Sequence, residues 1–235
     1  MNTHTDMATH NRDTRETERV LRLYEKEAHK YDREMNFFDR LLFAGAREWV
    51  CAQATGEVLE IGIGTGRNLS HYRDDVRLTG VELSPAMLEI ARARARELGR
   101  EVDLRVGDAQ ALEFPDQSFD SVVCTLSLCT IPDDRAAVAE MRRALRAGGR
   151  LLLLEHVRSP LLPVRLAQRL LDPLAVRFEA DHLLREPLDH LRAERFEVER
   201  LERSKLGIVE RIAARKPIAA ARKRQEPREE RINDR

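Results

Sequence analysis

The hydrophobic pattern along the chain alternates short β-branched runs with helical stretches. Two amphipathic helices are predicted first, over residues 14–33 and 37–54. Apolar runs then predict strands at residues 57–61, 76–82, 102–106, 119–125 and 150–157. The run at 119–125 is almost continuously apolar, which is typical of a strand buried on both faces.

Helices are predicted between these strands, near residues 65–72, 85–98 and 133–146. The second of them has clear boundaries, because Ser84 suits an N-cap, Pro85 suits the first helical position and Gly99 suits the end. Gly148-Gly149 is the expected stop of the third.

The last part of the chain predicts a proline-punctuated helical insertion at 160–194, followed by two strand-like runs at 196–204 and 207–216. The short link between these two runs indicates an antiparallel pair at a sheet edge. Together the elements predict an α/β, Rossmann-like fold: a seven-stranded, mostly parallel sheet with helices on both faces, N-terminal helices and the helical insertion.

The length of 235 residues suits one domain, expected at 15–215. The polar residues 1–14 and the charged tail 216–235 are expected to be disordered. No apolar run is long enough for a membrane span, and the polar N-terminus lacks the apolar region of a secretory signal.

Charge is balanced at 41 basic and 41 acidic residues, so no overall charge excess points to a nucleic-acid partner. Three cysteines without metal-like spacing favour reduced thiols in a cytoplasmic protein. Histidines are scattered without a ligand motif, and no metal site is expected.

The loop from Glu60 to Gly66 follows a predicted strand and precedes a predicted helix. Its glycines allow a sharp turn and let a ligand press against the backbone. Dinucleotide-binding loops have the spacing G-x-G-x-x-G, which would place a glycine where Arg67 stands. The observed spacing, G-x-G-x-G, therefore favours another nucleoside cofactor.

Acidic residues end the next two predicted strands. Glu82 could accept hydrogen bonds from both hydroxyls of a ribose, or it could simply favour the dipole of the following helix. Asp108 could accept from an exocyclic amine while the backbone at Ala109 meets the ring edge, or it could be an ordinary turn aspartate.

Four motifs in order, VLEIGIGTGRNL, GVELSPAMLEIAR, GDAQALEFPDQSFDSVVCTLSLCTIPD and LRAGGRLLLLEHV, resemble those of class I methyltransferases that use S-adenosylmethionine. The resemblance implies that S-adenosylmethionine is the cofactor and S-adenosylhomocysteine its product. In the family the glycine loop packs on the methionine moiety, Glu82 binds ribose and Asp108 faces adenine. The residues implied are Glu60, Gly62, Gly64, Gly66, Asn68, Glu82, Leu83, Met87, Asp108, Ala109, Gln110 and Leu126.

Two narrower resemblances concern the acceptor. VVCTLSLCTIPD, LLEHV, LLDP and HLLREPLDHL resemble a group of phospholipid N-methyltransferases and alkyl-thiol methyltransferases. YEKEAHKYDREMNF is similar to the N-terminal helix of ubiquinone and menaquinone C-methyltransferases, which implies that Tyr24 and Tyr31 approach the cofactor; core packing is the alternative.

Methyl transfer from a sulfonium is an in-line displacement, in which the protein mainly aligns the reactants and excludes water. His156 and His182 are the candidate catalytic residues, with Arg185 as a candidate for orienting an acidic or thiol acceptor. A structural histidine and a solvated helix edge are the respective alternatives. The apolar, arginine-bearing insertion predicts a lid packed on the domain, with contact to an anionic lipid surface as the alternative.

The expected function is methyl transfer to a small-molecule or lipid-like acceptor, either a hydrophobic thiol or secondary metabolite or a phospholipid amine. Quinone-precursor C-methylation and cofactor binding without catalysis are the alternatives. The glycine spacing, and the lack of a Tyr-x-x-x-Lys pair, disfavour a nicotinamide oxidoreductase. The sequence leaves the oligomeric state open.

Overall fold

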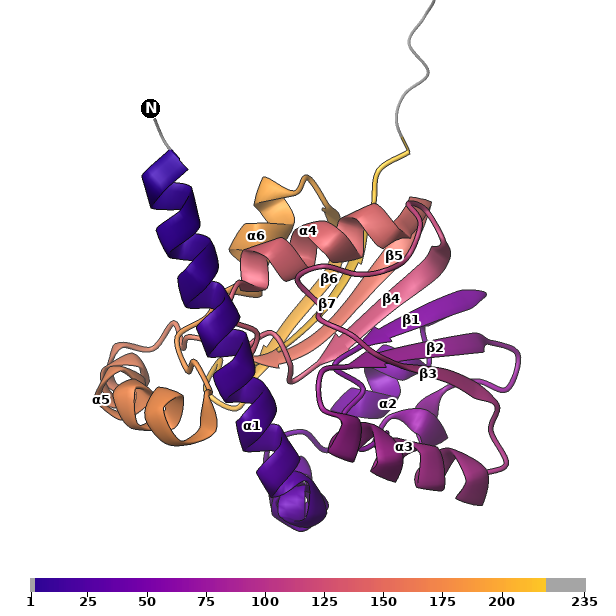
Figure 1. Ribbon diagram of the computed structural model, residues 1–235, viewed down its shortest axis with the longest axis horizontal. Coiled ribbons are helices and arrows are strands. Elements are labelled where there is room, and N and C mark those ends of the chain that lie inside the picture. The colour runs from indigo at the N-terminus through magenta and orange to yellow at the C-terminus, as the bar shows by residue number, and fades with distance from the viewer. Residues whose placement is uncertain (1–2, 219–235) are drawn as a thin grey trace, which may run out of the picture.

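The computed structural model describes the backbone of residues 3–218 and the side chains of 14–218. Its centre is a seven-stranded sheet in the order β3-β2-β1-β4-β5-β7-β6 (Figure 1). β1 to β5 are parallel, and β7 is antiparallel to both of its neighbours. The strands are β1 Glu57–Ile61, β2 Arg77–Glu82, β3 Val102–Val106, β4 Phe119–Thr125, β5 Leu145–His156, β6 Glu197–Ser204 and β7 Val209–Arg215.

Helices cover both faces of the sheet and make two apolar cores. The helices are α1 Thr3–Leu41, α2 Ala46–Cys51, α3 Pro85–Glu97, α4 Asp134–Ala144, α5 Leu162–Glu179 and α6 Pro187–Ala193, with a short 3-10 turn, η1, at Leu69–His71. Val122 and Leu151 face the α4 and α6 side, whereas Val123 and Leu152 face the α2 and α3 side. This period of two confirms that the β4 run is buried on both faces.

The predicted strands and their order in the chain are confirmed, including the antiparallel edge formed by β7. Residues 102–106 and 119–125 are strands over the predicted bounds. Ser84 is the N-cap of α3, where its hydroxyl accepts a hydrogen bond from the N–H of Met87 at 3.2 Å.

Several boundaries were predicted wrongly. The N-terminal helix runs from Thr3 to Leu41, so residues 3–14 are helical rather than disordered and no second helix starts at residue 37. Residues 65–72 form turns and η1 instead of an α-helix. Of the predicted tail, only 216–218 lie within the described residues, where they follow β7 without helix or strand.

Gly148-Gly149 does not stop a helix. α4 already ends at Ala144, and both glycines lie within β5, beside a shift in its register with β4. A Cβ on Gly149 would lie 2.9 Å from the Arg146 carbonyl oxygen and 3.0 Å from that of Asp120. The glycine is therefore required by a close backbone approach at this irregularity.

Pro173 does not interrupt the insertion either, because α5 continues through it to Glu179. Over the described residues, no helix is both long and apolar enough to cross a lipid bilayer.

Candidate cofactor and acceptor site

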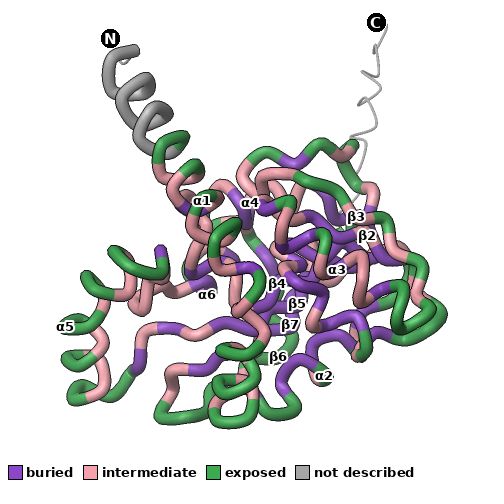
Figure 2. The backbone as a smooth tube through the Cα atoms, turned by 60° about the horizontal axis from the view of Figure 1, so that its bottom comes forward, coloured by how far each residue is buried: buried purple, intermediate pink, exposed green. Residues whose placement is uncertain are grey.

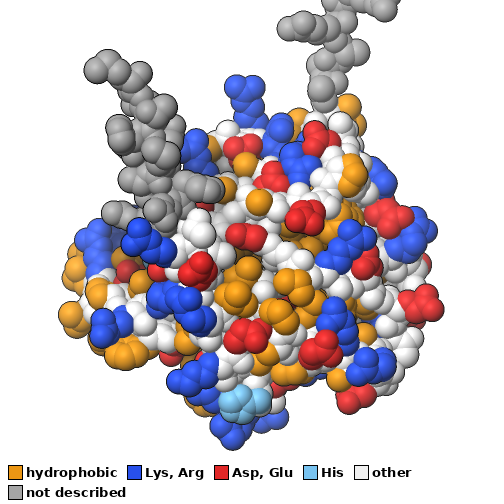
Figure 3. All heavy atoms as spheres, viewed as in Figure 1, with side chains coloured by type: hydrophobic (Ala, Val, Ile, Leu, Met, Phe, Trp, Pro, Cys, Tyr) orange, Lys and Arg blue, Asp and Glu red, His pale blue; other side chains and the backbone are white. Residues whose placement is uncertain are grey.

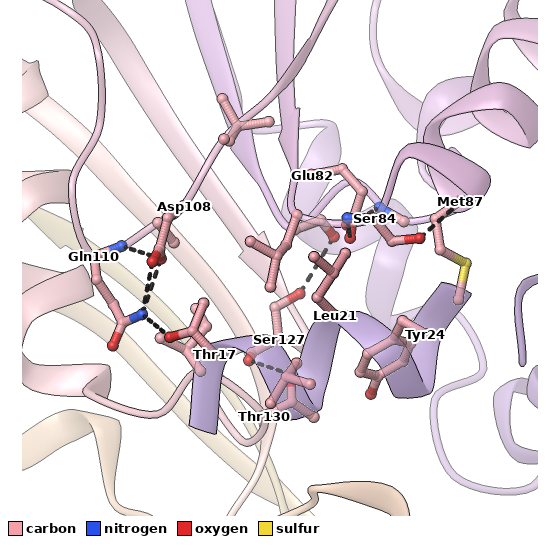
Figure 4. Close-up of a pocket in the computed structure, with 18 of the residues that line it drawn as sticks. Thr17, Leu21, Tyr24, Glu82, Ser84, Met87, Asp108, Gln110, Ser127 and Thr130 are labelled. Atoms are coloured by element: carbon pink, nitrogen blue, oxygen red, sulfur yellow. Dashed lines mark hydrogen bonds between the residues drawn. The ribbon is translucent and has the colours of Figure 1, made fainter. Parts of the chain in front are cut away.

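A pocket of about 720 Å3, part of it open to solvent, lies at the carboxyl ends of β1, β2, β3 and β4 (Figure 4). This is the edge at which parallel α/β sheets bind ligands. Its floor comes from the loops that follow the strands, and α1 crosses over it as a further wall.

Two glycines of the predicted loop line the pocket, and the third does not. Gly62 has φ +62, and a Cβ there would lie 2.4 Å from the Ser127 hydroxyl oxygen. Gly64 has φ +56, and its added Cβ would meet nothing closer than 4.0 Å, so the space beside it is the pocket itself. At Gly66 an added Cβ would lie 2.8 Å from a methyl carbon of Leu69, so this glycine serves packing.

Glu82 is positioned by the backbone. One carboxylate oxygen accepts from the N–H of Gly64 at 2.9 Å, and the other accepts from the N–H of Ser84 at 3.0 Å. Burial raises the pKa of Glu82, although the two N–H groups oppose this shift. Since each carboxylate oxygen can accept more than one hydrogen bond, both retain capacity for a ligand hydroxyl.

Asp108 and Gln110 form the end of the pocket at β3. Asp108 accepts from the backbone N–H of Gln110 and from its side-chain amide, both at 2.9 Å. The same amide donates to the Thr17 hydroxyl at 3.1 Å, and its oxygen accepts from the N–H of Asp133 at 2.9 Å. Gln110 therefore connects the loop after β3 to α1 and to the start of α4.

Leu83, Met87, Ala109 and Leu126, all of them predicted, contribute to the apolar part of the lining. Leu126 has φ +53, which is uncommon for a residue with a side chain, and its N–H donates to the Leu154 carbonyl at 2.8 Å. The turn at the end of β4 thus directs this leucine at the pocket.

Glu60 and Asn68 do not line the pocket. They lie beneath the glycine loop, where Asn68 and the Tyr72 hydroxyl donate to Glu60 at 2.7 and 2.9 Å. Burial raises the pKa of Glu60 to about 7, against these bonds and the charge of Arg47, which donates to Asn68 at 3.1 Å. Glu60 and Asn68 therefore support the glycine loop from the buried side.

Helix α1 forms one wall of the pocket, and only some of its lining residues were predicted from the sequence. Tyr24 and Tyr31, both predicted, line the pocket with their rings edge to face at 6.2 Å between centroids. Thr17, Val20 and Leu21 also line it and were missed. The amphipathic period of this helix indicated a buried face, but it did not indicate that this face covers a ligand site.

Polar contacts fasten α1 to the loops of the pocket. Glu25 accepts from the Ser84 hydroxyl at 2.7 Å and from the N–H of Ala86 at 2.9 Å, at the start of α3. Asp32 accepts from the Thr65 hydroxyl at 2.6 Å and forms ion pairs with Arg67 and Arg94. Arg67, which replaces the expected third glycine of a dinucleotide site, is therefore an anchor for α1.

His156, at the end of β5, forms a hydrogen-bonded pair with Asp181, with 2.8 Å between Nε2 and the carboxylate oxygen. Burial lowers the pKa of His156, but the hydrogen bond and charge of Asp181 outweigh burial and raise it overall. Asp181 directly follows α5 and its cap Ala180, and no motif in the sequence pointed to its role.

His156 does not itself line the pocket. Tyr24 and Tyr31 do line it, and burial raises the pKa of both hydroxyls. The ligand-type atoms of Cys129, His156 and Asp181 all lie within 4.8 Å of one another. Of these three residues, His156 and Asp181 are hydrogen-bonded directly to each other.

The other predicted acceptor-side residues have structural contacts. The N–H of His182 donates to the Cys129 carbonyl at 3.0 Å, and burial followed by the charge of Arg185 lowers the pKa of its imidazole. Arg185 pairs with Asp134 and donates to the Ile131 carbonyl at 2.7 Å. These contacts order the loop after β4 and do not point His182 or Arg185 into the pocket.

Glu155, the neighbour of His156, is buried beneath the same loop. One of its oxygens accepts from the N–H groups of Ser127 and Leu128, both at 3.0 Å. Burial raises the pKa of Glu155 to about 7, although these N–H groups lower it.

Residues 59–153 match the family model described as a methyltransferase domain. This match spans the glycine loop, Glu82, Asp108 and β4, all of which have the geometry described above. Over residues 59–153 the chain thus carries a methyltransferase domain.

Curated relatives of this methyltransferase domain have different acceptors in their names. The chain is 41% identical over 103 residues to a phosphatidylethanolamine N-methyltransferase of Cereibacter sphaeroides, covering 43% of this chain and 51% of the relative. It is 31% identical to a demethylmenaquinone methyltransferase of Tropheryma whipplei, covering 66% and 64%. It is 34% identical to a thiol S-methyltransferase of Homo sapiens, covering 56% and 55%. The chain thus spans about half to two thirds of the length of these relatives.

Solved structures share the fold of this methyltransferase domain. A putative methyltransferase from Bacillus halodurans superposes with a TM-score of 0.63 at 21% identity, covering 74% of this chain and 99% of that one. A geranyl diphosphate C-methyltransferase from Streptomyces coelicolor, solved with S-adenosyl-L-homocysteine, gives 0.67 at 19% identity, covering 86% and 98%. At this identity the likeness concerns the fold alone.

Proposed function

We propose that this protein binds S-adenosylmethionine in the pocket and transfers its methyl group to a hydrophobic, lipid-like acceptor. The observation that carries the proposal is the coincidence of Gly64, Glu82 and Asp108 around one pocket, each at the end of a different parallel strand or in the loop after it. Bare backbone, a fixed carboxylate and a second acid beside apolar side chains suit a nucleoside with an attached amino acid.

The residues present fit this cofactor. The open space beside Gly64 would hold the methionine part, Glu82 would accept hydrogen bonds from the ribose hydroxyls and Asp108 one from the adenine amine, with Leu83 and Met87 as the apolar neighbours of the ring. When bound, S-adenosylmethionine supplies a methyl group on a sulfonium that is already activated for displacement. The protein therefore has to position the acceptor, exclude water and accept a proton where the nucleophile carries one.

His156 is the proposed proton acceptor. Its Nε2 is engaged by Asp181, so Nδ1 is the atom left to take a proton from the acceptor. The Asp181 carboxylate then stabilises the imidazolium by its charge. His156 does not line the pocket, so the acceptor reaches it only if lining residues move; Tyr24, which lies within electrostatic range of Asp181, is the residue that we expect to move.

The lining favours an uncharged or cationic hydrophobic acceptor over an anionic one. Among the described residues that line the pocket there is no lysine or arginine, whereas Glu82 and Asp108 are acidic. Val20, Leu21 and Ile131 add apolar surface. A hydrophobic thiol or a phospholipid amine fits this character best, in line with two of the relatives' names, and a quinone precursor is the second candidate.

The test has two measurements on the purified full chain. Isothermal titration with S-adenosylmethionine and with NADH should give binding of the first alone; preferential binding of NADH would contradict the cofactor. Transfer of a labelled methyl group is then measured with alkyl thiols, phosphatidylethanolamine and demethylquinones. His156→Gln should lose most of the transfer while it retains cofactor affinity, and binding without transfer to any acceptor would overturn the catalytic proposal.

A further inference from the structure

Helix α5 is oriented with its apolar side away from the protein. It is 18 residues long and none of its residues is buried (Figure 2). Large apolar side chains recur at every fourth position, which places them along one side of the helix. They are 57, 53, 79, 54 and 64% exposed at Leu162, Leu166, Leu170, Leu174 and Phe178.

Two polar side chains fasten α5 to the rest of the domain. Gln168 accepts from the N–H of Ser159 at 2.8 Å and donates to the carbonyls of Val157 and Leu183 at 2.9 and 3.0 Å. Asp172 accepts from the N–H of Leu183 at 2.8 Å. Hydrogen bonds of Gln168 and Asp172, rather than contacts of the exposed leucines, therefore fasten α5 to the domain.

Basic side chains accompany the outward leucines. Arg169 and Arg177 are exposed on α5, and within the described residues neither forms an ion pair. The β6–β7 turn extends the surface, because Leu206 is 66% exposed, follows the exposed Lys205, and accepts at its carbonyl from the Ser159 hydroxyl at 2.7 Å. In Figure 3 orange apolar and blue basic side chains gather together where α5 lies.

We propose that this surface, α5 with the turn at Lys205-Leu206, docks on an anionic lipid bilayer. The leucines would enter the boundary between headgroups and acyl chains, and Arg169, Arg177 and Lys205 would contact lipid phosphates. A bilayer fits better than a second copy of the chain, because lipid phosphates would pair with Arg169 and Arg177, which form no ion pair within the described residues, while the acyl chains cover the leucines.

The docking surface adjoins the acceptor side of the pocket. Arg19 of α1 donates to the carbonyls of Val176 and Arg177, at 2.8 and 3.2 Å, in the last turn of α5. The turns of α1 around Arg19 carry Thr17 and Leu21 into the pocket, and α5 leads directly to Asp181. The choice of a membrane-resident acceptor rests on the proposed function, but the docking itself does not.

Vesicle flotation of the full chain tests this proposal. Vesicles of phosphatidylcholine alone are compared with vesicles that also contain phosphatidylglycerol. The wild type should float with the anionic vesicles, and the double substitution Leu170→Glu with Leu174→Glu should reduce the bound fraction at least about tenfold. Arg169→Gln with Arg177→Gln should reduce it only on anionic vesicles, by about three- to tenfold.

Leu98→Glu is the matched control, since Leu98 is an exposed leucine at the end of α3, and it should float as the wild type does. Cofactor titration on every variant checks folding without measuring transfer, so a failed methylation assay leaves the flotation result intact. Failure of the wild type to float, or undiminished flotation of the leucine variant, would overturn the proposal. The proposal would also be overturned if sedimentation velocity showed a wild-type dimer, the leucine variant were monomeric, and neither protein bound vesicles.

Discussion

The two halves of the sheet build their parts of the site differently. On the β1 to β3 side, backbone N–H groups of Gly64 and Ser84 fix Glu82, within a few residues of the strand ends. On the β4 to α6 side, His156 depends on Asp181, a side chain 25 positions away beyond a helix. One half is defined by local geometry and the other by tertiary placement, so they should respond differently to substitution.

The largest expected effect is a loss of cofactor affinity on the β1 to β3 side. Gly64→Val should weaken S-adenosylmethionine binding roughly 100-fold, because the side chain would occupy the pocket. Gly99→Val is the control: it has φ +62 with nothing within 4 Å of an added Cβ, and so bears comparable strain, about 1–2 kcal/mol, away from the pocket. Equal affinity of the two variants in titration calorimetry would contradict the assigned position of the cofactor.

The next effect concerns the pH dependence of activity, which should depend on the β4 to α6 side of the sheet. Asp181→Asn should lower kcat about 30-fold with little change in cofactor affinity, because His156 loses its charged partner. Activity of the wild type should rise with pH through the pKa of His156, which lies above its ordinary value of about 6.5. Since the carboxylate raises that pKa, the variant's rising limb should move to lower pH.

Asp172→Asn is the control for that profile, as Asp172 lies in the same insertion and holds a backbone N–H without touching His156. A pH–rate profile that is identical in Asp181→Asn and the wild type would rule out the proposed pair.

Glu82→Gln should weaken cofactor binding about tenfold, since hydrogen bonds from ribose hydroxyls to a carboxylate are stronger than those to an amide. kcat at saturating cofactor should change by less than about threefold. Titration calorimetry checks the cofactor affinity, and initial rates check kcat. A variant that is defective in kcat alone would mean that Glu82 acts on the transfer step.

The smallest effect concerns helix caps, one in each half. Ser84→Ala and Asp133→Ala each remove a side chain that accepts from an N–H in the first turn, of α3 and α4. Each should lower the free energy of unfolding by about 1 kcal/mol in urea titrations. Affinity for the cofactor should stay within about twofold, and a larger loss in Ser84→Ala would show that its bond to Glu25 on α1 matters for binding.

The same contrast explains what the sequence could predict. Strands such as 102–106 and 119–125 were located because an alternation of apolar and polar residues marks the first and a nearly continuous apolar run marks the second. Glu82 and Asp108 followed because they lie where such strands end. Asp181 was missed because its contact with His156 depends on where α5 ends in space. The apolar face of α5 was evident from its period, but the period does not tell which side faces the protein, and Gln168 and Asp172 decide that.

Helix α1 bears on where the functional unit begins. The family match covers residues 59–153, which includes the glycine loop, Glu82 and Asp108. Thr17, Leu21 and Tyr24 precede that match, yet they form one wall of the pocket. A fragment cut to the matched residues would keep the recognisable motifs and lose the wall that covers them. The boundary drawn by sequence similarity is thus narrower than the boundary drawn by the binding site.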